Sequence, residues 1–393
     1  MSLKSRIYLL SSLLLGLTVL CGMLTIQAYH SRLPLIGRLY GEGSASIAVN
    51  SETAAPLFSG LRPGPDEPHA TYYKNRVLVL MYHEVEQVPH DIGALSAAKF
   101  ERQLELMKAN NFHWITMDQY RDFILRGAPV PNNAVLLTFD DGYASFYQYA
   151  YPILSKYEAP ATSFLNVCTV GNPKEAGVPK LNWSQVKEMS RNGISFYSHS
   201  FDSHRYAPTD AKGKHMIAAL TGRIYLKELG RRETESEYER RVKADLEQAN
   251  VILERELGSP NHVLAFPYGA FSKSLLHISA QLGIDVTLTV KDGLDSTGQN
   301  NGFRLNAGGK QDNPELLLAL MKHAPQRLGH AHFDRAPERK REALWTLAGM
   351  AIVAALLAQS AGKLILEKRR TESPSQDSGS EPPKAPTSKE STG

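Results

Sequence analysis

Two adjacent aspartates close the apolar run LLTFDDG (136–142), and side chains of this type and spacing could do chemistry. Asp140 and Asp141 follow a stretch typical of a buried strand, where two neighbouring carboxylates repel each other. A divalent cation held by one of them would offset this repulsion with its own charge. The other carboxylate would then be free to accept a proton.

Two histidines lie five residues apart in the segment SHSFDSH (198–204). A surface position would be the simplest interpretation of either His199 or His204 alone. Two imidazoles and one carboxylate, however, form a common catalytic metal site with one coordination position left open. The pattern therefore indicates a divalent metal, with zinc as the first choice, although other first-row ions accept the same ligands.

The middle of the chain alternates strand-like and helix-like segments. The expected strands are 76–83, 113–117, 134–139, 161–167, 194–198, 262–269 and 284–290. The expected helices are 96–110, with Ser96 as the N-cap, 118–127, ending on Gly127, 143–157, 182–193, 236–258 and 272–283. Such alternation implies parallel strands joined by crossover helices. The sequence therefore predicts an α/β fold, a distorted (β/α) barrel of about seven units.

Active residues of such barrels lie on the loops that follow the C-terminal ends of the strands. Four polar clusters follow expected strands here: MYHE (81–84), TFDDG, SHSFDSH and FPYGAFS (266–272). We expect all four on one rim, and their joint placement favours a single site over coincidence.

The ordered motifs TFDDG, SHSFDSH and FPYG resemble those of the polysaccharide deacetylase family, also called the NodB-homology domain or carbohydrate esterase family 4. The early LMYHEV and the histidine spacing are most similar to the family's extracellular poly-β-1,6-N-acetylglucosamine N-deacetylases. The resemblance covers about residues 76–310. It implies a distorted barrel and metal-dependent removal of N-acetyl groups from an amino-sugar polysaccharide.

The resemblance also implies roles for single residues. Asp140 would be the general base, and Asp141, His199 and His204 would hold the metal. His83, in the YH element, would be the general acid. A structural histidine is the alternative interpretation of His83, and its rivals as the acid are His262, His323, His330 and His332.

One position departs from the family pattern. The wider family often has an arginine, which steadies the base, two residues before the proline of the PY element, where this chain has Ala265. Arg304 is a candidate substitute. We expect Tyr268 and Pro267 to border the site, with the Tyr268 backbone N–H as a candidate oxyanion donor or, alternatively, the tyrosine simply packing in a turn. Trp183 could stack on a sugar ring or lie in the core.

An apolar, uncharged run from Ile7 to Ala28 follows Lys4 and Arg6. About 20 such residues suffice to span a bilayer as a helix. The preceding basic residues favour a cytoplasmic N-terminus and a body outside the cell. We therefore expect an uncleaved transmembrane anchor in residues 1–29, with a cleaved signal peptide or lipoprotein signal as the alternatives.

A second apolar run begins at Ala343 and predicts a transmembrane helix over 343–366, with an interfacial helix as the alternative. The sequence further predicts a linker over 30–70, the deacetylase barrel over 71–325 and a disordered Pro/Ser-rich tail over 367–393. Residues 213–241 interrupt the barrel rhythm and could form a hairpin over the site or a lid on the core edge. The expected location is the cell membrane, with the catalytic domain extracellular.

Composition limits the partners. The net charge is only +4 over 393 residues, with no basic block among aromatics, which argues against nucleic acid. Two cysteines far apart imply no disulfide framework. The expected partners are a polysaccharide substrate, the membrane, and polysaccharide synthase or export machinery. The alternatives are a peptidoglycan N-deacetylase or O-acetyl esterase on the same scaffold, or a non-catalytic glycan-binding membrane protein.

Overall fold

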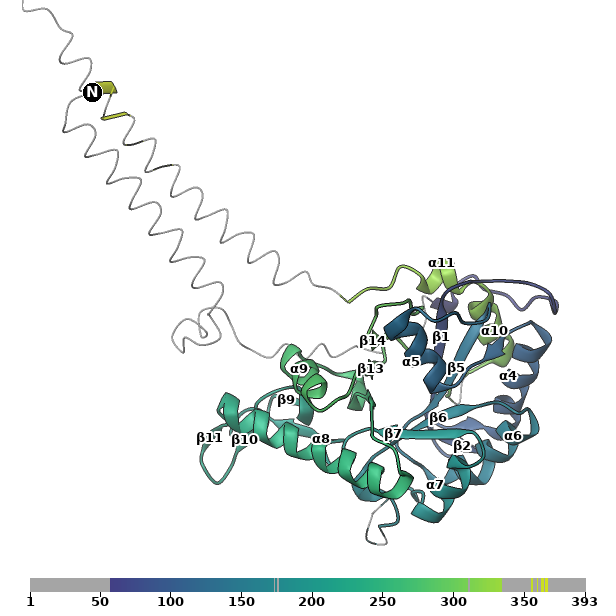
Figure 1. Cartoon of the computed structure of the whole chain (residues 1–393), viewed down its shortest axis with the longest axis horizontal. Helices are drawn as coiled ribbons and strands as arrows, with labels where there is room; N and C mark the ends of the chain where they lie inside the picture. Colours follow the sequence, from purple (N-terminus) through teal and green to yellow (C-terminus); the bar gives the residue numbers. More distant parts are fainter. Residues whose placement is uncertain are drawn as a thin grey trace, which may run out of the picture. The chain divides into compact units, whose positions relative to one another are not determined.

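The computed structural model describes residues 57–333, except 173, 175, 176, 310 and 311, together with residues 355, 359, 362, 363, 365 and 366 (Figure 1). The chain divides into two units, Gly43–His332 on one hand and Met1–Glu42 with Phe333–Gly393 on the other. The expected anchor in 1–29 and the expected tail in 367–393 lie outside the described residues, as does the expected helix in 343–366 apart from those six positions. Within the described part of the chain, every helix is too short or too polar to cross a membrane.

A sheet of nine parallel strands forms the centre of the large unit, as far as the described residues show. Its order is β14-β13-β12-β7-β6-β5-β1-β15, and β4 pairs with the start of β5. The strands are β1 (Val77–Tyr82), β4 (His113–Trp114), β5 (Ala134–Phe139), β6 (Ala161–Leu165), β7 (Ile194–Ser198), β12 (Val263–Ala265), β13 (Val286–Leu288), β14 (Asn301–Gly302) and β15 (Leu305–Asn306). The parallel α/β class predicted from the alternation is confirmed.

One short run of chain contacts both edges of this sheet. β14 pairs with β13 through Leu288 and Gly302, while β15 pairs with β1 through Leu80 and Leu305. Because only Phe303 and Arg304 separate β14 from β15, the sheet has to curl until its two edges meet this segment. The curled sheet agrees with the expected distorted barrel and places Arg304 at the junction.

Helices connect and cover the strands (Figure 1). They are α4 (Ala97–Ala109), α5 (Met117–Arg126), α6 (Tyr151–Lys156), α7 (Trp183–Ser190), α8 (Glu235–Leu257), α9 (Lys273–Gln281), α10 (Pro314–Lys322) and α11 (Ala324–Leu328). Ser96 accepts a hydrogen bond from the Lys99 N–H as the N-cap of α4, and Gly127 ends α5 in the left-handed conformation, both as predicted.

Two helix predictions need correction, and two helices of the structure were not predicted. The segment 143–157 is not one α-helix, because a π-helical turn, η3 (Phe146–Ala150), precedes α6. α7 ends at Ser190, and Gly193, with φ of 91°, belongs to the turn into β7. α10 and α11 were not predicted, although α10 packs apolar residues such as Leu317 and Leu320 into the core beside α4.

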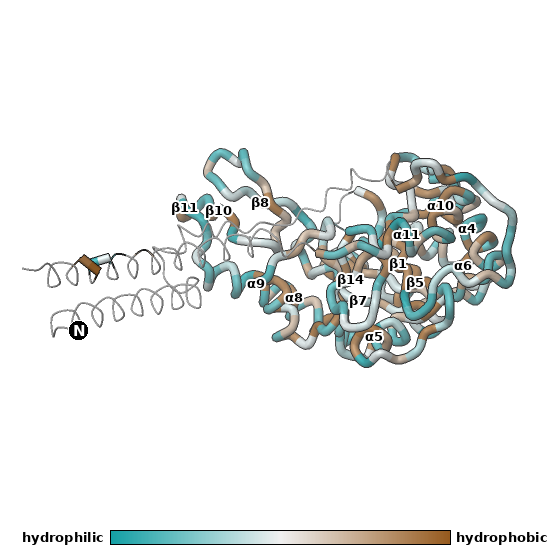
Figure 2. The backbone as a smooth tube through the Cα atoms, turned by 90° about the horizontal axis from the view of Figure 1, so that it is seen from above, coloured by the Kyte–Doolittle hydropathy of each residue, from teal (hydrophilic) through white to brown (hydrophobic). Residues whose placement is uncertain are grey.

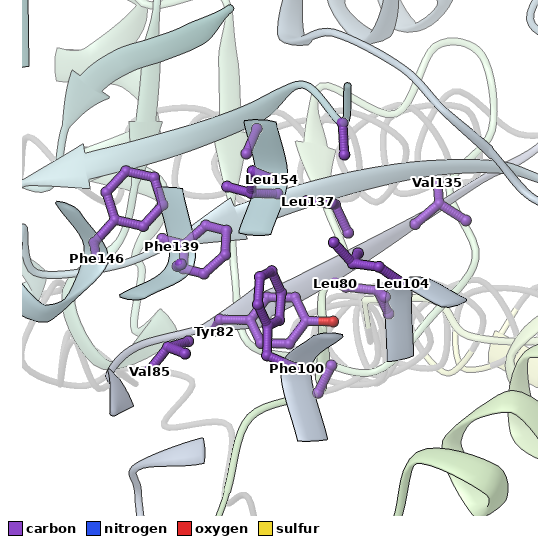
Figure 3. Packing of buried hydrophobic residues seen from close by; sticks show 14 of the residues in the cluster. Leu80, Tyr82, Val85, Phe100, Leu104, Val135, Leu137, Phe139, Phe146 and Leu154 are labelled. Carbon is purple, nitrogen blue, oxygen red and sulfur yellow. The ribbon is translucent and has the colours of Figure 1, made fainter. Parts of the chain in front are cut away.

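Alternating side chains of the central strands supply two apolar clusters, as expected for the period of two along a strand. Leu78, Leu80 and Tyr82 of β1 join one cluster with Phe100 of α4, and Figure 3 shows Leu80, Tyr82 and Phe100 close together. Val77 joins the other cluster with residues of α5, β12 and β13. Because β1 is buried on both faces, its packing fixes the position at which the following loop begins.

Short two-stranded sheets lie outside the central sheet. They are β2 (Val85–Glu86) with β3 (Leu95–Ser96), β8 (Tyr206–Pro208) with β9 (Met216–Ala218), and β10 (Tyr225–Leu226) with β11 (Arg231–Arg232). The last two are antiparallel and lie between β7 and α8 in the sequence, so they account for the interruption at 213–241. Figure 2 shows the turn between β8 and β9 as hydrophilic, in contrast to the hydrophobic β1.

Residues 57–70, expected to be the end of a linker, pack on the barrel instead. Leu57, Phe58 and Leu61 are partly buried against the core. The Glu67 N–H donates to Asn110 Oδ1 at 2.8 Å, and Lys322 Nζ donates to the Pro65 carbonyl at 2.7 Å. A part of the expected linker therefore contacts the barrel surface, while residues 62–69 are exposed.

Candidate active site

The two aspartates follow β5 and are buried, with exposed fractions of 3% for Asp140 and 5% for Asp141. Asp141 has φ of 71° and Gly142 has φ of 62°, so the chain makes a left-handed turn that aspartate and glycine tolerate. His199 Nε2 lies 4.0 Å from Asp140 Oδ2 and 3.7 Å from Asp141 Oδ1. The turn therefore brings both neighbouring carboxylates to one imidazole.

Asp141, His199 and His204 converge on one point. Asp141 Oδ1 lies 3.2 Å from His204 Nε2, and one ligand atom from each of the three residues lies within 4.8 Å of the others. His199 Nδ1 lies 2.7 Å from the Ala265 carbonyl oxygen, so Nδ1 carries the proton and Nε2 offers its lone pair to the site. Burial lowers the pKa of His199 to about 4, which keeps the ring neutral at pH 7, as a metal ligand must be.

Asp140 is paired with Arg304, the candidate substitute for the family's missing arginine. Arg304 Nη1 donates to Asp140 Oδ1 at 2.6 Å, and Arg304 Nε donates to the Thr289 carbonyl at 2.7 Å. Burial alone would raise the pKa of Asp140, but the guanidinium charge of Arg304 and its hydrogen bond hold it below its ordinary value. Asp140 is therefore ionised at neutral pH, with one oxygen held by the arginine.

His83 directly follows β1 and is half-buried. Burial would raise the pKa of both Asp140 and Asp141, and a charge on His83 is among the effects that lower it. β1 and β5 pair in parallel with Tyr82 opposite Phe139, so His83 and Asp140 follow their strands at the same end of the barrel. Three of its rivals instead face backbone carbonyls: His262 Nδ1 lies 3.0 Å from Gly283 O, His323 Nδ1 lies 2.9 Å from Ala319 O, and His332 Nδ1 lies 3.0 Å from His330 O.

Tyr268 borders the metal-ligating residues. Its ring centroid lies 4.5 Å from that of His204 and 4.3 Å from that of Tyr206, on which it stacks at 26°. With Pro267 it forms a tight turn in which Tyr268 has φ of 58°, a left-handed conformation uncommon for a tyrosine. A Cβ on Gly269 would lie 2.6 Å from Val290 N, so the turn is pressed against the chain after β13.

A pocket of about 310 Å³ opens beside Asp141 and His204. Its other lining residues are Tyr143, Asn166, Cys168, Thr169, Val178, Lys180, Phe201, Asp202 and Arg205. Trp183 does not line this pocket and instead packs, partly buried, against the core at the start of α7.

Sequence reasoning missed several polar residues of this pocket, and two of them donate hydrogen bonds to Asp141. Asn166 Nδ2 donates to Asp141 Oδ1 at 3.0 Å. Lys180 Nζ donates to the Asp141 carbonyl at 3.1 Å and lies 3.6 Å from the centre of the Tyr143 ring. Asn166 follows β6, so the rule that active residues follow barrel strands could have found it. Lys180 lies in a loop with no such signal.

Comparisons with known proteins show what this chain is similar to. A sequence model described as polysaccharide deacetylase matches residues 127–287. The poly-β-1,6-N-acetyl-D-glucosamine N-deacetylase of Escherichia coli strain K12 is 26% identical over 277 residues, which cover 66% of this chain and 41% of that protein. The protein of the same name from Staphylococcus aureus strain N315 is 24% identical over 243 residues, covering 58% of this chain and 77% of that protein.

A solved structure described as a de-N-acetylase from Aggregatibacter actinomycetemcomitans is similar with a TM-score of 0.56. It is 23% identical, and the likeness covers 62% of this chain and 99% of that one. At this identity the likeness concerns the fold. This chain spans only 41% of the length of its Escherichia coli relative.

Proposed function

We propose a function from one premise, that this chain belongs to the polysaccharide deacetylase family through its residues 127–287. It is a metal-dependent hydrolase that removes N-acetyl groups from an amino-sugar polysaccharide such as poly-β-1,6-N-acetylglucosamine. The observation that carries the proposal is the convergence of Asp140, Asp141, His199 and His204 at the C-terminal end of the barrel. A binding module would need neither an ionised buried base nor a set of metal ligands.

The residues present fit a divalent metal. Asp141, His199 and His204 would hold it, and two imidazoles with one carboxylate favour zinc. The hydrogen bond from His199 Nδ1 to Ala265 fixes the ring in the tautomer that coordination through Nε2 requires. When bound, such an ion supplies Lewis acidity, which lowers the pKa of water from 15.7 to about 7.

Asp140 is the general base of the proposed reaction. Arg304 holds its Oδ1, while its Oδ2 faces His199 and the metal-ligating residues. The ionised carboxylate accepts a proton from the water whose oxygen adds to the acetyl carbonyl carbon. The Tyr268 backbone N–H is the proposed donor to the oxyanion that forms there, since this residue lies beside His204.

The leaving amine must receive a proton when the C–N bond breaks, because an amide anion is too basic to depart. His83 is the proposed donor, since it follows β1 at the same end of the barrel and histidine titrates near neutral pH. The products are acetate and a free amino group on the sugar.

Acetate release from defined glycans tests the substrate. The names of the Escherichia coli and Staphylococcus aureus relatives favour β-1,6-linked N-acetylglucosamine oligomers. Chitooligomers, peptidoglycan and acetylated xylan, each measured with and without a chelator, are the comparisons. Faster release from peptidoglycan or xylan would favour the N-deacetylase or esterase alternative, and no release from any glycan would favour a binding protein.

The proposed location is the cell membrane, with the barrel outside the cytoplasm and with polysaccharide synthase or export machinery as partners. The apolar runs from Ile7 to Ala28 and from Ala343 to Gly362 support a membrane attachment. Protease added to intact protoplasts should digest the region from about residue 70 to residue 330. Full protection of that region would contradict the proposed orientation.

A further inference from the structure

A second group of metal-ligating side chains lies on the chain between β1 and β3. One ligand atom from each of Glu84, His90 and Asp91 lies within 4.8 Å of the other two. None of the three belongs to the Asp141, His199 and His204 set, and the proposed reaction uses none of them.

The buried carboxylate of Glu84 is independent evidence that this group of side chains binds a ligand. The residue is only 6% exposed, and its buried Oε2 atom has no hydrogen-bond partner among the described residues. A buried carboxylate oxygen without a partner is costly, so such groups are normally paired or bound to a metal.

His90 is already oriented as a ligand. Its Nδ1 lies 2.7 Å from Glu86 Oε2, and its Nε2 lies 3.9 Å from Asp91 Oδ2. A carboxylate that accepts from the first ring nitrogen, and so directs the second nitrogen towards a cation, is the usual arrangement around metal-binding histidines.

Asp91 is held in a complementary way. Its Oδ1 accepts hydrogen bonds from the backbone N–H groups of Gly93, at 2.6 Å, and Ala94, at 3.1 Å. Oδ2, the atom that faces His90, is therefore left for a ligand. The side chains of His90 and Asp91 are about half exposed, so water could complete the coordination.

We propose that Glu84, His90 and Asp91 bind a second divalent cation, separate from the catalytic one. Two carboxylates and one imidazole fit a first-row ion of the Zn²⁺ or Mn²⁺ class better than Ca²⁺, which takes oxygen ligands only. The bound cation supplies the missing partner of the Glu84 carboxylate. It ties the loop between β2 and β3 to Glu84, which directly follows His83 after the end of β1.

Metal content of the full-length protein tests this proposal. The protein is loaded with Zn²⁺, dialysed against metal-free buffer and measured by inductively coupled plasma mass spectrometry. Wild type should retain two equivalents. A His90→Ala/Asp91→Asn variant should retain one, and so should a His199→Ala/His204→Ala variant, whereas the variant with all four changes should retain none.

A matched control and a second readout complete the test. His113→Ala removes another exposed histidine, one whose Nδ1 faces the Asn132 carbonyl, and should retain both equivalents. In the His199→Ala/His204→Ala background, added Zn²⁺ should raise the unfolding temperature, and the further His90→Ala/Asp91→Asn change should abolish that rise. Because His90 and Asp91 are exposed, their replacement leaves the core intact.

The second site and the proposed function can fail separately. The second site would be overturned if wild type retained one metal equivalent, the His199→Ala/His204→Ala variant retained none and the His90→Ala/Asp91→Asn variant still retained one. The proposed function would stand in that case. An equal Zn²⁺-induced rise in unfolding temperature with and without His90 and Asp91 would also overturn it.

Discussion

Replacing Arg304 with methionine should destabilise the barrel and abolish activity, because this change leaves a buried carboxylate without its partner. Arg304 is fully buried and Asp140 almost so, and their charged atoms lie 2.6 Å apart. Breaking a buried ion pair by removing one partner costs roughly 3–5 kcal/mol. At about 2–4 °C per kcal/mol for a domain of this size class, the unfolding temperature should fall by roughly 6–20 °C.

A double-mutant cycle separates the pair from general damage to the core. Asp140→Asn alone leaves a buried guanidinium unpaired and should also destabilise, whereas Arg304→Met with Asp140→Asn removes both charges. The double variant should therefore lose less stability than the sum of the two single variants. Thermal unfolding followed by circular dichroism provides the measurement.

Arg126 offers a matched control on the surface. Its Nη1 lies 2.8 Å from Asp122 Oδ1, nearly the same separation, but both side chains are exposed. Surface pairs contribute about 0–1 kcal/mol, so Arg126→Met should shift the unfolding temperature by no more than about 4 °C. If Arg304→Met and Arg126→Met had equal effects, or if the cycle were additive, the account of a buried structural pair at the base would be refuted.

Three further predictions concern single side chains. Asp140→Asn should keep the catalytic metal and lose turnover, whereas Asp141→Asn should weaken metal binding, and the reverse result in a metal assay would exchange their roles. His83→Ala should lower kcat steeply on an amide and less on an activated ester, whose leaving group needs little protonation; equal losses on both substrates would count against the acid role. Burial raises the pKa of Asp295 to about 7, so the native state keeps a proton that the unfolded state releases near pH 4. The free energy of unfolding should therefore fall as the pH rises from about 4 to about 7, and Asp295→Asn should remove that part of the fall in urea titrations, whereas an unchanged slope would contradict the shift.

The site residues that could be predicted from the sequence are those that follow the ends of strands. Asp140, His199 and Tyr268 each follow a strand with a clear apolar signal, so the barrel rule could place them on one rim before the structure was known. His83 follows the same rule after β1.

Arg304 could be singled out but not placed with certainty from the sequence. It lies 164 residues from Asp140, between two strands of two residues each, which are too short to show a period. Its contact arises only when the curled sheet brings its two edges to the same segment. Lys180 carries no local signal either, because its position depends on the loop that packs over Tyr143.

The helices at the end of the barrel illustrate a different limit. The run PELLLALMK of α10 is apolar on most sides, so periodicity does not reveal which face it buries. In the structure Leu317, Leu318, Leu320 and Met321 are all buried with the core. Tertiary packing beside α4, rather than a local pattern, determines where this helix lies.

Acetate release measured together with bound metal tests the central claim most directly. Purified protein and its His199→Ala and His204→Ala variants are compared on β-1,6-linked N-acetylglucosamine oligomers, with metal content determined on the same samples. Each substitution should remove one metal equivalent and abolish acetate release, and metal added back should restore chelator-treated wild type but neither variant. Full acetate release from a metal-free preparation, or from either variant, would contradict the account.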